Sequence, residues 1–260
     1  MIITTWNINS IKVRLHAVLQ YLSEFTPDVL VLQETKTIDD NFPKDEIIAA
    51  GYHVTYYGQK TYNGVAVISK KKPSFVDYNP VKTTANEARS LTVNVSGITI
   101  VNLYVVNGQE VGSEKYVYKL NWLKKLEAYT KKLLAESDKV ILLGDFNIAP
   151  TNDDVFDIDT TKDNILCSNK ERYALGSLLN LGLFDVFNDF NFPAQTFTWW
   201  DYRSGAFQRN IGFRIDLILL TKNLKDICAE YHIDKETRHK SWCLAEPRTS
   251  DHAPVRIILK

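Results

Sequence analysis

Short apolar runs recur along this chain, and each is bounded by polar or turn-forming residues. The clearest is Val140–Leu143, which is followed by Gly144, Asp145 and Asn147 and then by Pro150. An apolar run of this length between Gly and Pro predicts a buried strand. Asp and Asn are common after strands because their side chains bond to the local backbone in turns. The rest of the sequence decides whether Asp145 and Asn147 form a simple turn or have a chemical role.

Further apolar runs predict a chain rich in β-strands. The predicted strands are Ile2–Trp6, Val29–Leu32, Val65–Ser69, Leu91–Val95, Thr99–Val105, Val140–Leu143, Ile215–Leu220 and Val255–Leu259. Segments with helical periodicity separate some of them: Ser10–Phe25, Ser113–Glu136 and Ser168–Gly182. The last segment opens with a capping box, Ser168 and Glu171, and stops at a glycine.

The connections between these elements indicate the fold class. Some are short, such as the Ser96-Gly97 turn, which favours antiparallel hairpins beside βα units. The chain has 260 residues, 45% of them hydrophobic, without a low-complexity linker or a fixed-period repeat. We therefore predict a single α/β domain over residues 1–260, a four-layer α/β sandwich in which two packed mixed β-sheets are flanked by helices.

Charge and cysteine content limit the class of protein. Lys and Arg number 31, as do Asp and Glu, so a nucleic-acid partner would have to contact a local basic face. The 3 cysteines are an odd number without C-x-x-C spacing, which favours a reducing compartment. The N-terminal segment lacks the features of a signal peptide, and no apolar run is long enough to span a membrane. We expect a cytoplasmic monomer that does not bind membranes.

Polar side chains stand at the ends of several predicted strands. Those that follow or close a strand are Asn7, Glu34, Tyr104, Asn107, Asp145 and Asn147, and those at strand starts are Asp216, Asp251 and His252. In a sheet with antiparallel pairing, the start of one strand lies beside the end of its neighbour. These side chains are therefore expected to converge on one edge of the sandwich.

Each of these residues also has a purely structural interpretation. Glu34 is a reasonable helix cap, and Asn7 and Asn147 are ordinary turn formers. Asp216 fits a solvated strand end, and His252 fits a core histidine with a satisfied ring. The structural interpretations are credible one at a time, but a whole series of apolar strands ending on Asp, Asn, Glu or His is harder to explain by turns.

The combined set indicates metal-assisted hydrolysis of a phosphate ester. Glu34, Asp145 and Asp251 offer the hard oxygen ligands that Mg²⁺ or Mn²⁺ prefers. A carboxylate and an amide near a metal can orient water and support charge on a phosphoryl oxygen. The sequence contains no G-x-S-x-G motif and no Gly-rich phosphate loop. A zinc site at His239, Cys243 and His252 is disfavoured because the paired short spacings of zinc sites are missing.

Ordered motifs along the chain carry a family resemblance. They are "WNIN", "LQET", "NGVAVIS", "NLYVVNG", "LLGDFNIAP", "TFTWWDYR", "GFRIDLIL" and "SDHAPV". The set runs from Thr5 to Val255 and resembles the exonuclease III family of DNA-repair nucleases, which includes apurinic/apyrimidinic endonucleases, within the endonuclease/exonuclease/phosphatase superfamily. "GDFN" and "SDH" occur across that superfamily, whereas "TWWDYR" followed by "GFRIDL" indicates the DNA-repair branch.

The resemblance implies a metal site and a position for the attacking water. Glu34 would be the main ligand of Mg²⁺, with Mn²⁺ as a substitute, and Asp251 and Asn9 would assist it. Asp145 would position or deprotonate the water. In some relatives an aspartate stands where Asn9 is, so the contribution of Asn9 to the metal site stays open.

The resemblance also implies which residues contact the scissile phosphate. Asn7 and Asn147 would bind and stabilise it, and Tyr104 would reach the same group. Asp216 would pair with His252, whose ring would contact a phosphate oxygen. Under this interpretation Asp145 and Asn147 are catalytic rather than a simple turn.

A pocket and a basic face complete the implied site. Trp199, Phe213 and Ile215 match positions that line a pocket for a base-free deoxyribose, although buried aromatic residues are often ordinary core. We expect Arg209 to contact DNA, together with Arg203 and Arg214, because arginines mixed with aromatic rings suit an exposed DNA backbone. Further phosphate contacts are expected from Lys70, Lys71, Lys72, Lys115 and Lys119, with a solvated face as the alternative.

The sequence departs from the family pattern at three places. Asn9-Ser10 stand where a glycine often follows the first motif, Val106 stands where many relatives carry proline, and Arg248-Thr249-Ser250 replace a shorter lead-in to Asp251.

The resulting prediction is an Mg²⁺-dependent exodeoxyribonuclease III-like enzyme. It would cleave duplex DNA 5′ to an abasic site, with 3′→5′ exonuclease activity and cleaning of 3′-blocked ends as further activities. One alternative is a phosphatase or phosphodiesterase of the same superfamily that acts on a lipid or inositol phosphate. Another is a non-catalytic DNA-binding relative.

Overall fold

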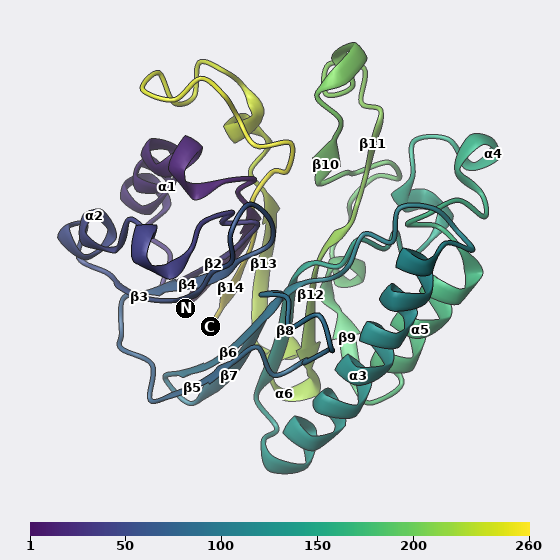
Figure 1. Cartoon of the computed structure of the whole chain (residues 1–260), viewed down its shortest axis with the longest axis horizontal. Helices are drawn as coiled ribbons and strands as arrows, with labels where there is room; N and C mark the ends of the chain where they lie inside the picture. The colour runs from purple at the N-terminus through teal and green to yellow at the C-terminus, as the bar shows by residue number, and fades with distance from the viewer.

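The computed structural model describes residues 1–260 and contains two six-stranded β-sheets packed face to face (Figure 1). The first sheet has the strand order β13 (Cys228–Ile233), β14 (Val255–Leu259), β1 (Ile2–Asn7), β2 (Val29–Gln33), β4 (Val65–Ser69) and β3 (His53–Tyr57). The second has the order β5 (Phe75–Tyr78), β6 (Ser90–Val95), β7 (Ile98–Tyr104), β8 (Val140–Asp145), β12 (Asp216–Thr221) and β9 (Leu183–Asp185).

Helices cover the outer face of each sheet. On the first sheet lie α1 (Ile11–Phe25) and α2 (Lys44–Ala49), and on the second lie α3 (Glu114–Glu136) and α5 (Asn169–Leu179) (Figure 1). Two shorter helices are α4 (Ile158–Thr161) and α6 (Lys222–Lys225). A small hairpin, β10 (Trp199–Trp200) and β11 (Gly212–Phe213), rises above the sheets. None of the helices combines the length and the apolar character that crossing a bilayer requires.

Three apolar clusters hold the four layers together, and β8 shows how the sequence builds them. Ile141 and Leu143 belong to the cluster between the two sheets, whereas Val140 and Leu142 belong to the cluster under α3 and α5. Successive side chains of a strand point to opposite faces, so a strand buried on both faces must be apolar throughout. A third cluster lies between the first sheet and its helices. The predicted four-layer α/β sandwich is confirmed.

Both sheets mix parallel and antiparallel pairs, which brings strand ends and strand starts to one edge. The pairs β1–β2 and β7–β8 are parallel, and β8–β12 and β1–β14 are antiparallel. Gly144 allows β8 to approach β7 closely, because a Cβ on Gly144 would lie 1.9 Å from the Leu103 carbonyl oxygen. This approach places Asp145 opposite Tyr104 on β7 and opposite Asp216 on β12.

Candidate active site

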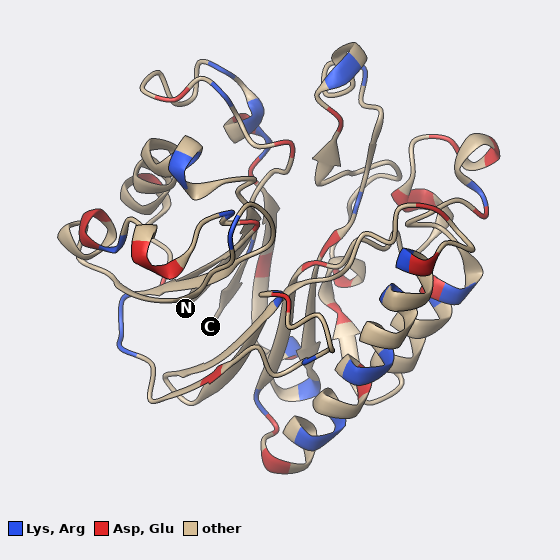
Figure 2. Cartoon of the chain, in the orientation of Figure 1, with Lys and Arg blue, Asp and Glu red and all other residues tan.

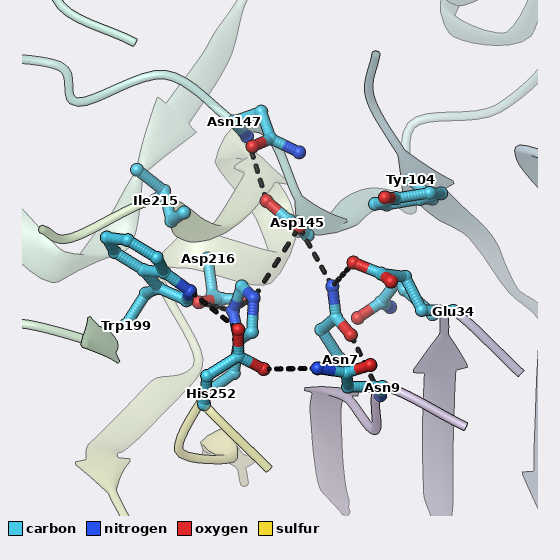
Figure 3. A network of polar contacts seen from close by, with 12 residues as sticks. Asn7, Asn9, Glu34, Tyr104, Asp145, Asn147, Trp199, Ile215, Asp216 and His252 are labelled. Atoms are coloured by element: carbon cyan, nitrogen blue, oxygen red, sulfur yellow. Dashed lines mark hydrogen bonds and ion pairs between the residues drawn. The ribbon is translucent and has the colours of Figure 1, made fainter. Parts of the chain in front are cut away.

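The polar residues predicted to converge do converge, at the edge where both sheets end beneath the β10–β11 hairpin (Figures 1 and 3). The first sheet supplies Asn7 from the end of β1, Glu34 directly after β2, and Asp251 and His252 just before β14. The second sheet supplies Tyr104, Asp145 and Asp216 from β7, β8 and β12. The site is therefore assembled from two separate sheets.

Asn7 links the two sheets at the centre of the site. Its Nδ2 atom donates to Glu34 Oε1 at 2.9 Å and to Asp145 Oδ2 at 2.9 Å. Its Oδ1 atom accepts a hydrogen bond from the Asn9 backbone N–H at 3.1 Å, which fixes the orientation of the amide. The position of the Asp145 carboxylate relative to Glu34 thus depends on one fully buried asparagine.

The Asp145–Asn147 segment forms a turn and also faces the site. Asp145 Oδ1 accepts a hydrogen bond from the Asn147 backbone N–H at 2.9 Å, as a turn requires. Its other oxygen, Oδ2, points to Asn7 instead. The Asn147 side chain donates to the Val105 carbonyl at 3.0 Å and accepts from Asn107 at 3.0 Å. Turn preference alone explains the hydrogen bond of Asp145 Oδ1 but not that of Oδ2.

A buried histidine and aspartate form the second part of the site. His252 Nδ1 lies 2.9 Å from Asp216 Oδ2, and His252 Nε2 lies 3.8 Å from Asp145 Oδ2. The Thr198 hydroxyl donates to Asp216 Oδ2 at 2.6 Å and holds that carboxylate in place. Burial lowers the pKa of His252, but the charges of Asp216 and Asp145 outweigh it and raise the pKa to about 10. His252 is therefore an imidazolium at neutral pH.

The environment of Asp145 shifts its pKa toward neutrality. Burial raises the pKa most, the His252 charge opposes this, and the charges of Asp216 and Glu34 raise it further, to about 7. A carboxyl with a pKa near 7 can exchange a proton with water at physiological pH. Such shifts are typical of groups that transfer protons, although structural ion pairs also cause them.

The donor set at this edge fits a divalent cation. Ligand atoms of Glu34, Asp145 and His252 all lie within 4.8 Å of one another. His252 Nδ1 is bonded to Asp216, and the carboxylates of Glu34 and Asp145 supply the oxygen ligands of this group. The Lys36 ammonium lies 2.7 Å from Glu34 Oε2 and 2.6 Å from Asn9 Oδ1, so a positive group is already attracted to these two oxygens. Carboxylate and amide oxygens are what Mg²⁺ prefers.

The other two predicted metal ligands, Asp251 and Asn9, bond to each other. Asn9 Nδ2 donates to Asp251 Oδ1 at 2.9 Å, and Trp199 Nε1 donates to Asp251 Oδ2 at 3.0 Å. Burial opposes ionisation of Asp251, but the His252 charge and these two hydrogen bonds outweigh it and lower the pKa. Asp251 is thus ionised at the edge of the site, outside the tight cluster of Glu34, Asp145 and His252.

Tyr104 lies beside the same carboxylates from the side of β7. Burial raises the pKa of its phenol well above the usual value, and the charges of Glu34 and Asp145 raise it further. The Arg89 guanidinium stacks over the ring, 4.8 Å from its centroid. Tyr104 is therefore a fixed, neutral hydroxyl group at the site.

The predicted pocket residues form an apolar wall, and two of them, Trp199 and Ile215, lie next to His252 and Asp145 in Figure 3. Trp199 packs against Phe213 with ring centroids 5.8 Å apart, and Ile215 is buried beneath them. Trp199 and Phe213 are half-buried, so parts of both rings remain accessible. Residues of the segment before α5, including Leu166, pack against the same wall.

The structure corrects part of the predicted DNA-binding face. Arg209 and Arg203 are exposed on the hairpin, as expected, where Figure 2 shows basic residues above the sheets. Arg214 is instead buried between Asp154 (2.5 Å) and Asp185 (2.8 Å), so its guanidinium cannot reach DNA. The prediction for Arg214 is wrong because three arginines close in sequence were assumed to share one surface.

The predicted lysine contacts are also corrected. Lys119 is fully buried and paired with Glu171, so it cannot contact a DNA phosphate. Lys70–Lys72 follow β4, which runs antiparallel to β2, and therefore lie at the opposite end of the sheet from Glu34. Lys115 is exposed near the start of α3.

Two residues of the site were not predicted from the sequence. Lys36 stands two residues after Glu34, and its proximity to a carboxylate at a strand end was an available signal. Thr198, which holds Asp216, carried no signal, because a threonine in a strand pattern is ordinary.

Known proteins are similar to this chain in both sequence and fold. The Endonuclease/Exonuclease/phosphatase family matches residues 4–252. The exodeoxyribonuclease of Bacillus subtilis is 32% identical, over 100% of this chain and 99% of its own length. The 3′ phosphatase NExo from Neisseria, solved with a product DNA hairpin, has a TM-score of 0.95 at 39% identity and covers 100% of this chain and 99% of its own. An AP endonuclease from Archaeoglobus fulgidus has a TM-score of 0.92 at 36% identity, with coverage of 100% and 99%.

Proposed function

The chain belongs to the Endonuclease/Exonuclease/phosphatase family, and we propose that it is an Mg²⁺-dependent DNA-repair nuclease that cleaves the phosphodiester 5′ to an abasic site. The resemblance of its motifs to the exonuclease III family is confirmed by relatives named exodeoxyribonuclease III and exodeoxyribonuclease. The metal, the cleaved bond and the substrate are the proposal.

One geometric observation carries the proposal. The Asn7 amide joins Glu34 to Asp145, and His252 faces the same Asp145 oxygen. A metal-binding carboxylate (Glu34), a carboxylate that can act as a base (Asp145) and an imidazolium (His252) would therefore surround one point. The apolar wall of Trp199 and Ile215 lies directly beside that point (Figure 3). A phosphate placed there would have its sugar against the wall.

The chain's own residues can position water and neutralise developing charge. Asp145, with a pKa of about 7, would accept a proton from the attacking water. The His252 imidazolium, kept protonated by Asp216, would donate to a phosphate oxygen as negative charge develops. Asn7 and Asn147 would orient the phosphate, and the neutral Tyr104 hydroxyl would donate to it from the other side.

Magnesium would be held by Glu34, with Asp251 and Asn9 beside it. When bound, it would supply Lewis-acid stabilisation of the phosphoryl oxygens. The Lys36 ammonium would have to move away from Glu34, because a lysine and a divalent cation compete for the same oxygen.

The substrate preference would come from the apolar wall. An abasic sugar leaves the DNA stack at lower cost than an intact nucleotide, because it has no base to unstack or unpair. Trp199 and Phe213 would then contact the bare sugar. The relative solved as an AP endonuclease supports this choice.

A second candidate activity is the processing of 3′ ends, as an exonuclease or a 3′-end-cleaning enzyme. The specific observation in its favour is the likeness to the Neisseria 3′ phosphatase, at a TM-score of 0.95 and 39% identity. Both activities would use the same catalytic edge. We further propose a monomer acting on duplex DNA in the cytoplasm, a reducing compartment that the unpaired Cys167, Cys228 and Cys243 support.

Three substrates compared side by side test the proposal. They are a duplex with one abasic analogue, the same duplex with a 3′-phosphate at a nick, and an inositol phosphate, each with Mg²⁺ and with EDTA. We expect Mg²⁺-dependent cleavage of the abasic duplex and no phosphate release from the inositol phosphate. The reverse pattern would support a lipid or inositol phosphatase, and no activity on any substrate would support a non-catalytic relative.

A further inference from the structure

A fully buried ion pair lies next to the segment that follows β8 and carries Asn147. It consists of Lys119 on α3 and Glu171 on α5, whose charged groups are in hydrogen-bonding contact. Both side chains have no exposed surface. Fully buried charges are costly, and they persist only where good hydrogen bonds satisfy them. The contacts of this pair therefore indicate what it does.

The Lys119 ammonium binds the two loops that carry the site amides. It donates to the Asn147 carbonyl oxygen at 2.6 Å, to the Asn107 carbonyl oxygen at 3.0 Å and to Glu171. An ammonium has three donors, so all of them are used. The side chains of Asn107 and Asn147 are also bonded to each other at 3.0 Å. One lysine thus fixes the loops after β7 and β8 together.

Glu171 extends this contact to the apolar wall. Its Oε1 atom accepts from the Leu166 backbone N–H at 3.1 Å, and its Oε2 atom accepts from the backbone and hydroxyl of Ser168 at 3.0 and 2.6 Å. The Leu166 carbonyl in turn accepts from the Ala149 N–H at 2.7 Å. The predicted capping box at Ser168 is confirmed, but its glutamate also serves the catalytic side of the fold.

Asn147 is linked to Asp145 through its backbone. Its φ angle is 50°, in the left-handed region that asparagine adopts more readily than most other residues. Its N–H is bonded to Asp145 Oδ1, so a shift of Asn147 would move the Asp145 carboxylate. An apolar side chain at position 119 would fill the same space but would leave the Asn147 carbonyl without its donor.

We propose that Lys119 is a positioning residue for phosphodiester hydrolysis: paired with Glu171, its ammonium holds Asn147 and thereby the Asp145 carboxylate in the reactive arrangement. The inference rests on the proposed nuclease function for its effect on the rate. Its claim about the loop is independent of activity.

The main test removes both charges at once. Lys119→Met alone would leave a lone buried carboxylate and could unfold the chain, whereas Lys119→Met/Glu171→Gln leaves no buried charge and keeps the capping box. We expect the double variant to fold with a Tm lowered by about 5–15 °C, because the Asn107 and Asn147 carbonyls lose their donor. We expect its kcat on an abasic duplex to fall about 10²-fold, because small misplacements of catalytic groups cost about that much. KM should change little.

Ile47→Ala is the control for a merely structural effect. Ile47 is fully buried on α2 and belongs to the cluster between the first sheet and its helices, which contains no residue of the Gly144–Pro150 segment. The cavity should lower Tm by about 5–15 °C. The kcat of this control, measured well below its Tm, should equal that of the wild type.

Hydrogen exchange measured by mass spectrometry gives the readout that does not depend on activity. Exchange in the peptide covering Gly144–Pro150 should be faster in the double variant than in the wild type and unchanged in Ile47→Ala. Unchanged exchange would overturn the proposal whatever the kcat, and faster exchange with wild-type kcat would overturn its catalytic part. A wild-type protein that fails to cut DNA would refute the proposed function, while the exchange result would still decide whether Lys119 holds the loop.

Discussion

The Asn7 amide is the smallest unit on which the site depends. It places Glu34 of one sheet and Asp145 of the other at hydrogen-bonding distance from the same Nδ2 atom. Glu34 has a φ angle of 53°, which is unfavourable for a glutamate, whereas the φ angle of Asn147, 50°, is one that asparagine adopts more readily. The chain thus accepts local strain where side chains of the two sheets meet.

Metal binding is predicted to depend on the charge of Glu34. Glu34→Gln removes one of the few negative charges available to a hard cation and should weaken Mg²⁺ binding by at least about tenfold. Titration calorimetry with Mg²⁺ measures this directly. Glu136→Gln, at the exposed end of α3, is the control and should bind Mg²⁺ as the wild type does. Wild-type affinity in Glu34→Gln would reject Glu34 as a ligand.

The Asp216–His252 pair predicts a specific pH dependence of stability in the metal-free protein. The pKa of His252 is raised from 6.5 to about 10, so the pair stabilises the fold fully below pH 6.5, and this contribution is lost as the pH rises through about 10. Asp216→Asn should cost about 3–5 kcal/mol below pH 6.5, because it breaks a buried pair. The difference from the wild type should shrink toward pH 10. Denaturant unfolding at several pH values checks this, and a difference that does not vary with pH would mean that His252 is neutral in the fold.

Residue patterns predicted that the site residues converge, but not whether an individual Lys or Arg side chain is buried or exposed. Strand-end carboxylates and amides could be placed because strand pairing is regular. Lys119 and Arg214 were placed wrongly on a DNA surface, because burial of a cation depends on partners far away in sequence. Glu171 and Asp185, which pair with them, are 52 and 29 residues distant.

At the scale of elements, the β10–β11 hairpin carries Trp199 and Phe213 and adjoins the edge that holds the polar site residues. The Trp200 N–H donates to the Asp251 carbonyl at 3.0 Å, and the Ala253 N–H donates to the Thr198 carbonyl at 2.8 Å. The hairpin is therefore bonded to the segment that carries Asp251 and His252. These backbone bonds fix the position of the hairpin relative to Asp251 and His252.

Selectivity for abasic sites is predicted to depend on Trp199. Trp199→Ala removes one hydrogen bond to Asp251 but none to Glu34 or Asp145, and it should bring the cleavage rates of abasic and intact duplexes closer together. Trp200→Ala is the matched control, because Trp200 is fully buried in a separate cluster. That control should lower stability by about 3–5 kcal/mol and keep the selectivity of the remaining folded enzyme. Unchanged selectivity in Trp199→Ala, with a large fall in Tm, would show that Trp199 is ordinary core.

DNA binding is predicted to be steeply salt-dependent although the net charge is zero. Arg209→Glu on the exposed hairpin should weaken binding and reduce the slope of log K against log salt by about one or more, because phosphate contacts release counterions. Lys131→Glu, on the exposed face of α3 away from the site, should have little effect. Fluorescence anisotropy at several salt concentrations compares the DNA affinity of the two variants. Equal losses of affinity in Arg209→Glu and Lys131→Glu would contradict a local DNA-binding face at the hairpin.

The elements themselves were predictable where both faces are buried. The strands Val65–Ser69 and Val255–Leu259 have the predicted bounds, and the other predicted strands shift by one or two residues. The missed strands include β3, β5 and β13, which are edge strands. Edge strands are partly exposed and carry mixed polar and apolar residues, so no apolar run marks them.

At the scale of the whole molecule, a buried polar contact fixes how the sheets are aligned beneath the site. Gln33 Nε2 donates to Asn102 Oδ1 at 2.7 Å, and Asn102 Nδ2 donates to the carbonyls of Leu32 and Ala66, both at 2.9 Å. This contact joins β7 to β2 and β4 across the otherwise apolar space between the sheets. Its existence was not predictable from the sequence, because facing residues of two sheets have no fixed sequence spacing.

The central claim is that this two-sheet edge hydrolyses the phosphodiester 5′ to an abasic sugar with Mg²⁺. The most direct measurement maps the new ends produced from a duplex with one abasic analogue, on a denaturing gel, for the wild type and for Asp145→Asn. The account predicts one cut, an upstream fragment with a 3′-hydroxyl that a polymerase extends, no cut in EDTA, and a rate at least about 10²-fold lower for Asp145→Asn. A cut on the 3′ side of the abasic site, a 3′ end that cannot be extended, or full activity in EDTA would contradict it.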